Sequence, residues 1–230
     1  MPAKKTIRTI LSLAIIAIIF FLSIIILNNH IEKREIKSEI PDTLNYQVPS
    51  SLELSDFDLQ EGSGELNLVL YEDYTDALSY DFAKTIEQAQ TDFPDKLKIA
   101  YRFYNANNTI LAKELALAII CAEEQDQGLE LRKNIYRKLE ESNGQIGLNR
   151  IITDKIALDV NSFETCMDNE ENRIMVSSLK DRAEQLSIYG TPTAFLDGEI
   201  IIGAKPYENF TDSNDDEIEG LKQMIERKLN

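Results

Sequence analysis

Residues 190–202 read GTPTAFLDGEIII, and this stretch constrains the fold more than any other part of the chain. Its centre is Asp197-Gly198, which separates two short apolar runs. An Asp-Gly pair between two apolar runs is a strong signal for a tight β-hairpin. We therefore expect a loop over residues 190–193 that leads into two antiparallel strands.

A strand, a helix and a second strand are predicted earlier in the chain. Residues 66–71 form a short apolar run that is typical of a buried strand. Between residues 78 and 93, apolar side chains recur every three or four positions, which places them on one face of a helix. Residues 97–103 alternate between apolar and polar side chains, as a second strand does. Strands joined in this way by a helix are parallel.

Helical patterns fill most of the chain between the second strand and the hairpin. Residues 110–122 are apolar nearly all round, which predicts a buried helix, and apolar stripes over residues 131–139 and 175–186 predict others. A last helix is expected from about residue 217 to residue 228. The order of elements is therefore βαβ, several helices, then ββα, which is an α/β class.

Three short motifs occur in this frame in a recognisable order. Residues 71–74 read YEDY at the end of the first strand, residues 190–193 read GTPT, and residues 203–207 read GAKPY before the last helix. Together they resemble the DsbA-like family of extracytoplasmic thiol oxidoreductases. The resemblance implies a thioredoxin-like fold over residues 63–230, with an inserted helical subdomain at about residues 108–187. It also implies that Pro192 is cis.

The resemblance breaks at the start of the first helix of the domain. The family motif D-Y-x-C-P-x-C reads DYTDALS over residues 73–79, so Asp76 and Ser79 stand where the two cysteines belong. Thiol–disulfide exchange needs an attacking thiolate and a second sulfur that resolves the mixed disulfide. We therefore expect no dithiol chemistry at these degenerate motif positions.

Asp76 is expected to cap the helix, because its carboxylate can accept backbone N–H groups and is stabilised by the helix dipole. Two catalytic alternatives remain open at this point. Asp76 could act in acid–base chemistry with Asp73 or Glu72, or Ser79 could act as a nucleophile. The second alternative lacks an activating base, because the only histidine is His30, next to the N-terminal apolar run.

Cys121 and Cys166 are the only cysteines, and both fall in the predicted helical insertion. Some members of the resembled family carry a second, structural cysteine pair in such positions, so the resemblance implies a structural disulfide. The disulfide would close a loop of about 45 residues, worth about 3 to 4 kcal/mol, and would require an oxidising compartment. Two buried free thiols or a redox-active pair are the alternatives.

Residues 9–27 form an uncharged run dominated by isoleucine, leucine, alanine and phenylalanine. At about 1.5 Å per residue the run spans roughly 28 Å, close to the hydrocarbon thickness of a bilayer. We expect a transmembrane helix at residues 9–28, a cytoplasmic N-terminus at residues 1–8 and a tether at residues 29–62. The alternative is a cleaved signal peptide, which would have a shorter apolar run and a small-residue cleavage site.

The orientation of this anchor is not set by flanking charge, because equal numbers of basic residues lie on both sides of the run. The expected disulfide places the domain outside the cytoplasm, on a single-pass cell-membrane protein. Residues 31–230 hold 21 Lys+Arg against 40 Asp+Glu, a balance of −19. A surface this acidic argues against nucleic acid as a partner.

No metal or other cofactor is expected. A histidine-based site inside the domain is excluded, because His30 lies outside it. The acidic stretch at residues 212–216 resembles the start of a calcium-binding loop. However, Glu217 stands where that loop requires glycine, and Gln223 stands where it requires glutamate.

The sequence favours a membrane-anchored, extracytoplasmic binding domain without dithiol activity. In the resembled family, the loop before the cis-proline pairs its backbone with an extended peptide. This implies a protein or peptide partner at Thr191 and Pro192, with apolar contacts from Tyr74, Leu78 and Tyr189.

An enzyme is the alternative. It would be a diverged thiol–disulfide oxidoreductase that assists protein disulfide formation in the cell envelope through Cys121 and Cys166, or an acid-dependent activity at Asp73 and Asp76. Assays of dithiol oxidation and of peptide binding would separate these alternatives.

Overall fold

The computed structural model describes residues 52, 54, 55, 58–142 and 156–230. The predicted N-terminus at residues 1–8, the predicted membrane helix at residues 9–28 and most of the predicted tether at residues 29–62 lie outside the described residues. Of the helices that the structure does describe, none is long and apolar enough to cross a bilayer.

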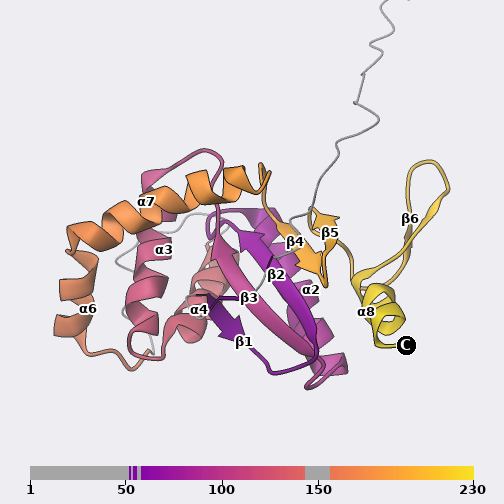
Figure 1. Ribbon diagram of the computed structural model, residues 1–230, viewed down its shortest axis with the longest axis horizontal. Coiled ribbons are helices and arrows are strands. Elements are labelled where there is room, and N and C mark those ends of the chain that lie inside the picture. The colour runs from indigo at the N-terminus through magenta and orange to yellow at the C-terminus, as the bar shows by residue number, and fades with distance from the viewer. Residues whose placement is uncertain (1–51, 53, 56–57, 143–155) are drawn as a thin grey trace, which may run out of the picture. The chain divides into compact units, whose positions relative to one another are not determined.

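A five-stranded mixed sheet forms the centre of the domain, with the strand order β1-β3-β2-β4-β5 (Figure 1). Its strands are β1 (Leu59–Glu61), β2 (Leu66–Glu72), β3 (Leu97–Phe103), β4 (Thr193–Leu196) and β5 (Glu199–Ile202). β2 and β3 are parallel, and the other three pairings are antiparallel. The parallel pair and the hairpin of β4 and β5 are those that the sequence predicted.

Six described helices surround or extend from this sheet. They are α2 (Ala77–Asp92), α3 (Ile110–Glu123), α4 (Gly128–Glu141), α6 (Val160–Met167), α7 (Glu170–Gln185) and α8 (Leu221–Leu229). α2 connects the parallel strands β2 and β3, and α3, α4, α6 and α7 belong to the insertion between β3 and β4. This is the thioredoxin-like α/β arrangement with an inserted helical subdomain that the sequence predicted.

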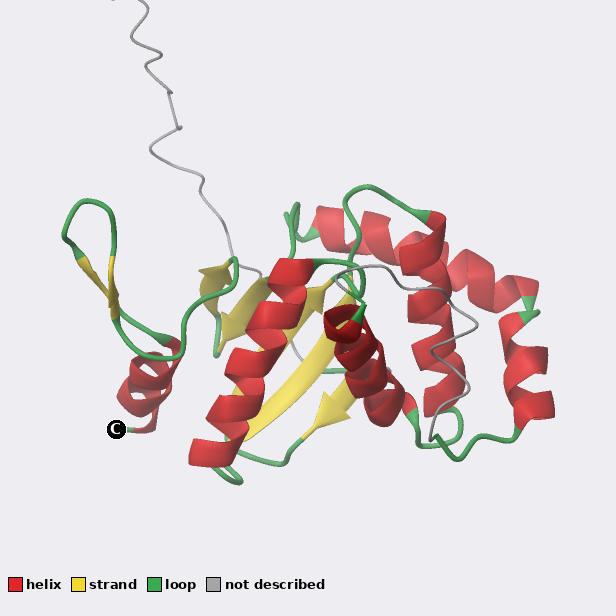
Figure 2. Ribbon diagram, turned by 180° about the vertical axis from the view of Figure 1, so that it is seen from behind, coloured by secondary structure: helices red, strands yellow, loops and turns green. Residues whose placement is uncertain are grey.

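Alternating side chains of the strands bury both faces of the sheet. On one face, Leu68 and Ile99 belong to the main core with residues of α2, α3, α4 and α8. Figure 2 shows α2 and α4 in front of this face. On the other face, Val69 and Phe195 cluster with Ile188, which follows α7, and with Leu52. The sheet is therefore covered on both sides, and the loops at its ends are left to form a site.

The domain begins before the predicted boundary at residue 63. β1 pairs antiparallel with β3 at one edge of the sheet, and Leu59 is buried. Just before β1, Asp58 accepts two hydrogen bonds from the Arg102 guanidinium, at 2.8 and 2.7 Å. The prediction that the tether extends to residue 62 is therefore wrong. A three-residue strand with one apolar side chain is too short to show a period, so the sequence pattern does not reveal it.

The predicted start of the last helix is also corrected. Two short strands, β6 (Phe210–Thr211) and β7 (Glu217–Ile218), form a hairpin before it, and α8 begins at Leu221. The turn of this hairpin is closed by Asp212, whose Oδ1 accepts the backbone N–H groups of Asn214 and Asp216 at 2.8 and 3.0 Å. Residues that compete for such local hydrogen bonds favour turns over helices.

Candidate functional site

Asp76 is the N-cap residue of α2, as the sequence predicted. Its backbone is extended, and its carboxylate accepts the backbone N–H of Leu78 at 3.2 Å and that of Ser79 at 3.1 Å. These N–H groups belong to the first turn of the helix and have no partner within it. The carboxylate thus holds the position where the resembled family carries a nucleophilic sulfur.

The peptide bond between Thr191 and Pro192 is cis, as the resemblance implied, and the loop that contains it lies beside Asp76. The Thr191 hydroxyl donates to Asp76 Oδ2 at 3.4 Å. The sheet explains this approach of two segments far apart in the chain. β2 and β4 are antiparallel neighbours with Tyr71 opposite Thr193, so the end of β2 and the start of β4 meet at one edge.

Ser79 contacts the same carboxylate from within the first turn of α2. Its hydroxyl donates to Asp76 Oδ2 at 3.0 Å and accepts the backbone N–H of Asp73 at 3.2 Å. Ser79 is fully buried. A nucleophile must reach a substrate, so the interpretation of Ser79 as a nucleophile does not fit this arrangement.

Asp73 holds the loop between β2 and α2 in place. Its Oδ1 accepts the backbone N–H and the hydroxyl of Thr75 at 2.8 and 2.7 Å, and its Oδ2 accepts the side-chain amide of Asn105. Asn105 in turn accepts the backbone N–H of Thr109, the N-cap residue of α3, at 2.7 Å. Both oxygens of this buried carboxylate are engaged, which fits a structural role better than acid–base chemistry.

Comparison with known proteins agrees with this geometry. A family model described as "DSBA-like thioredoxin domain" matches residues 68–213, more than half of the chain. The chain belongs to this family. The search of curated proteins found no match to this chain.

Solved structures give the same fold at low sequence identity. BdbD from Bacillus subtilis aligns with a TM-score of 0.60 at 16% identity, over 75% of this chain and 93% of that one. A thioredoxin-like oxidoreductase from Silicibacter pomeroyi DSS-3 gives 0.55 at 17%, over 76% and 94%. The thiol-disulfide exchange protein alpha-DsbA2 from Wolbachia pipientis gives 0.55 at 18%, over 74% and 87%. At these low identities the solved structures show that the DsbA-like domain shares their fold.

Of the five residues predicted to contact peptide, Tyr74 lies in the core and not at the surface. Its side chain is 3% exposed and its ring stacks on Phe103 with a centroid distance of 5.8 Å. Burial is the main cause that raises the pKa of Tyr74 well above its ordinary value. The aromatic ring belongs to the core, so the predicted peptide contact at Tyr74 is wrong. The motif gives the position of Tyr74 after the strand but not the direction of its ring.

Two of the other predicted contacts, Leu78 and Tyr189, lie at the surface. Leu78, in the first turn of α2, is 53% exposed, and Tyr189, just before the cis-proline loop, is 63% exposed. Pro192 is buried, so its side chain does not offer the predicted contact, whereas Thr191 is half-buried. Within residues 58–142 and 156–230, neither the backbone N–H nor the C=O of Thr191 forms a hydrogen bond. The loop therefore presents the free backbone groups that strand pairing requires.

Cys121 and Cys166 are joined in a disulfide that links α3 to α6 inside the insertion. Of the three cysteine states left open by the sequence, the bond excludes two free thiols, and a structural disulfide and a redox-active pair remain. Both residues are buried, at 0% and 6% exposure.

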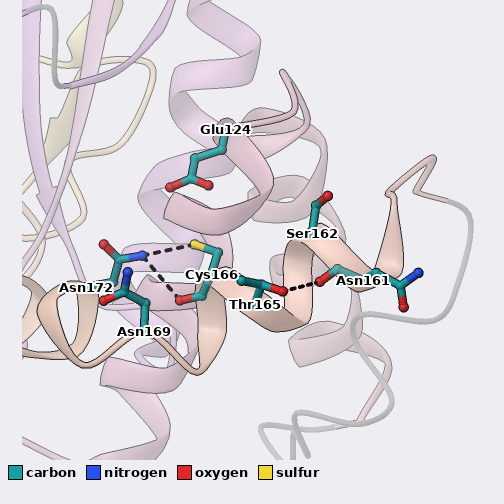
Figure 3. A pocket seen from close by; sticks show the side chains of 7 residues that line it. All are labelled: Glu124, Asn161, Ser162, Thr165, Cys166, Asn169 and Asn172. Atoms are coloured by element: carbon teal, nitrogen blue, oxygen red, sulfur yellow. Dashed lines mark hydrogen bonds between the residues drawn. The ribbon is translucent and has the colours of Figure 1, made fainter.

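Cys166 borders a pocket of about 390 Å³. Figure 3 shows the pocket, in which Asn172 points toward Cys166 and donates to its sulfur at 3.2 Å. The lining consists of amides, hydroxyls, Cys166 and one carboxylate, from Glu124, Asn161, Ser162, Thr165, Asn169 and Asn172. Among the described residues that line the pocket, none has a basic side chain that would stabilise a thiolate.

The structure contains a buried ion pair next to the site, between Glu72 and Arg132, that the sequence did not predict. Glu72, the last residue of β2, accepts Arg132 Nε at 2.6 Å and Arg132 Nη2 at 2.7 Å, and it also accepts the Tyr136 hydroxyl at 2.9 Å. Arg132 also lies over the Tyr101 ring, 3.7 Å from its centroid.

This pair joins the sheet to α4 of the insertion. Burial lowers the pKa of Arg132, but Glu72, Tyr101 and Tyr136 together outweigh burial and hold that pKa well above its ordinary value. Arg132 stands beside the predicted apolar stripe of its helix, and nothing in the local pattern points to a partner 60 positions away. Glu72 is therefore committed to Arg132, which removes it as an acid–base partner for Asp76.

Proposed function

We propose that this DsbA-like protein binds extended peptide segments at the cis-proline loop and does not catalyse dithiol exchange there. The observation that carries the proposal is the position of the Asp76 carboxylate. It lies 3.4 Å from the Thr191 hydroxyl, on the helix end that faces the loop. A carboxylate and the buried hydroxyl of Ser79 can neither attack a disulfide nor resolve one.

Peptide binding is supported by the backbone of Thr191. An extended segment can pair with its N–H and C=O groups as an added strand, which gives affinity that is largely independent of sequence. Leu78 and Tyr189 flank the loop with exposed apolar surface. Such surface on both sides of a strand-pairing segment suits a chain with alternating side chains.

We also propose that the domain is held at a membrane by a single-pass helix at residues 9–28, on the extracytoplasmic side. The uncharged run over residues 9–27 supports the anchor. The Cys121–Cys166 disulfide supports the oxidising side, because disulfides persist outside the reducing cytosol. The domain would then hold partner chains close to the membrane surface.

The second candidate function is thiol–disulfide exchange, the activity named for alpha-DsbA2 from Wolbachia pipientis, here through Cys121 and Cys166. The observation in its favour is the pocket that borders Cys166. Against it, Cys121 is fully buried, and the pocket-lining residues that the structure describes include no cationic side chain. A reactive cysteine normally needs both access and a neighbouring positive charge.

Two assays on the full-length protein in detergent micelles test these functions. We expect no reduction of insulin and no oxidation of a dithiol peptide. We expect binding of a labelled extended peptide of alternating valine and threonine, lost in Thr191→Pro, which removes the backbone N–H. The matched control is Thr191→Ala, which removes the hydroxyl contact to Asp76 but keeps the N–H and should still bind. Dithiol activity that disappears in Cys121→Ala would establish the second candidate instead.

The missing sulfurs can also be restored. The double variant Asp76→Cys/Ser79→Cys should reduce insulin measurably above the wild-type background, because a cysteine at a helix N-terminus has a lowered pKa and the second cysteine can resolve the mixed disulfide. The single variant Asp76→Cys is the control, and it should not catalyse the reduction of insulin because it lacks the resolving cysteine. A double variant that folds but stays inactive would show that the site is blocked by more than the two substitutions.

A further inference from the structure

The Asp76 carboxylate has only neutral partners. It accepts two backbone N–H groups and the hydroxyls of Ser79 and Thr191. No lysine or arginine in the described part of the chain forms an ion pair with it. Neutral donors stabilise a carboxylate but leave its net charge uncompensated, so the charge remains available to an incoming cation.

The two oxygens of this carboxylate are not equally occupied. Oδ2 accepts hydrogen bonds from Ser79 N, Ser79 Oγ and Thr191 Oγ1. Oδ1 accepts only the backbone N–H of Leu78, through a hydrogen bond exposed to solvent. A carboxylate oxygen can accept about two hydrogen bonds. Oδ1 therefore has capacity for a donor that arrives from solvent.

The position of Thr191 brings a bound peptide to this oxygen. Its hydroxyl touches the carboxylate, and its backbone groups are the ones that a peptide strand would pair with. A side chain of the paired strand therefore projects close to Asp76. The charge of the chain acts in the same direction, because residues 31–230 carry a balance of −19 that attracts cationic segments and repels acidic ones.

We propose that the preferred ligand of the cis-proline loop is an extended segment with an arginine or lysine facing Asp76, flanked by apolar residues that contact Leu78 and Tyr189. This inference rests on the proposed function. It names the class of partner as a basic, strand-forming peptide. Asp76 stands where the family motif has its nucleophilic cysteine. At this position the carboxylate would select a cationic side chain of the peptide, whereas a cysteine would react with a sulfur.

A pair of labelled heptapeptides tests the selection on the full-length protein. Both alternate valine and threonine around a central residue, which is arginine in one and citrulline in the other. Citrulline keeps the shape of arginine but lacks its charge. We expect the arginine peptide to bind about three- to tenfold more tightly at low salt, the range of a charge-assisted contact at a half-exposed site. High salt should reduce the ratio toward one.

Two variants assign the effect to Asp76. Asp76→Asn keeps an N-cap side chain and should bring the ratio of the two peptide affinities to about one. Asp81→Asn is the matched control. It removes an acidic charge one turn along the same helix, where Asp81 pairs with Lys84 at 2.8 Å, and should leave the preference intact.

The outcomes separate this inference from the proposed function. Equal binding of both peptides that is lost in Thr191→Pro would overturn the basic preference and leave peptide binding established. Binding of neither peptide would overturn the proposed function itself. A preference that persists in Asp76→Asn would show that another acidic group is responsible and would overturn the assignment to Asp76.

Discussion

Glu72 and Asp76 are four residues apart, at the end of one strand and the start of the next helix, yet their surroundings are opposite. Glu72 is fully buried and meets the guanidinium of Arg132 through two hydrogen bonds, at 2.6 and 2.7 Å. Asp76 is half-buried and meets only neutral N–H and O–H groups. One carboxylate has its cation inside the fold and the other has none.

The difference shows how access to water divides the roles of two acids in one segment. A buried carboxylate must have a partner of opposite charge, because the low-dielectric interior penalises an isolated ion strongly. A half-exposed carboxylate is solvated and can remain charged without one. The first arrangement fixes the insertion to the sheet, and the second leaves a charge at the surface beside the cis-proline loop. We therefore expect substitutions of Glu72 to affect stability and substitutions of Asp76 to affect binding.

The largest effect is expected from Glu72→Gln. It would leave the Arg132 charge buried without its partner, at a cost of about 3 to 5 kcal/mol in the free energy of unfolding. The measurement is urea denaturation followed by circular dichroism. Asp76→Asn is the matched change at the other carboxylate and should alter stability by less than about 0.5 kcal/mol, because asparagine caps a helix as well as aspartate does.

A double variant sharpens this test. Glu72→Leu/Arg132→Met replaces both charges with apolar side chains, and it should be less destabilised than Glu72→Gln because no buried charge remains unpaired. A cost for Glu72→Gln below about 1 kcal/mol would contradict the view that the pair holds the insertion to the sheet.

A smaller loss is expected from Cys121→Ala/Cys166→Ala. The disulfide joins two residues that are 45 positions apart in the insertion and so closes a loop of the chain. Its removal should lower the free energy of unfolding by about 3 to 4 kcal/mol. Because neither cysteine belongs to the Asp76 end of the domain, peptide binding by the folded variant should be unchanged. Loss of binding in a variant that is still folded would instead connect the disulfide to the site.

The smallest effect is expected from Asp76→Ala. It removes the N-cap hydrogen bonds to Leu78 and Ser79 and should destabilise the protein by about 1 kcal/mol, while Asp76→Asn should not. Thermal unfolding of the two variants side by side measures the difference. Equal stability of the alanine and asparagine variants would mean that the cap contributes little and that Thr191 and Ser79 hold the helix start by other contacts.

Much of the fold was predictable because its signals are local. The Asp-Gly turn of residues 197–198, the apolar period of α2 and the alternation of β3 each occupy a few consecutive residues. The elements missed were β1 and the small hairpin before α8, which are two or three residues long and show no period. The motif resemblance then indicated how the predicted elements assemble.

The site was only partly predictable. The role of Asp76 as a helix cap was predicted, and Leu78 is exposed as a peptide contact requires, but the contact between Asp76 and Thr191 came only from the structure. Tyr74 was assigned to the surface but packs on Phe103. The roles of Asn105 and Arg132 depend on partners 32 and 60 positions away along the chain, and no local pattern specifies such partners.

The sequence by itself determined that no sulfur stands at the start of the first domain helix, since side-chain chemistry is independent of folding. It also determined the order of the main strands and helices, because hydrophobic periods and turn residues act over short distances. Only the tertiary structure decided which of two neighbouring carboxylates lies beside a buried cation and which remains open to solvent. Burial and ion pairing arise when distant segments meet, and β2, β4 and α4 meet only in the folded chain.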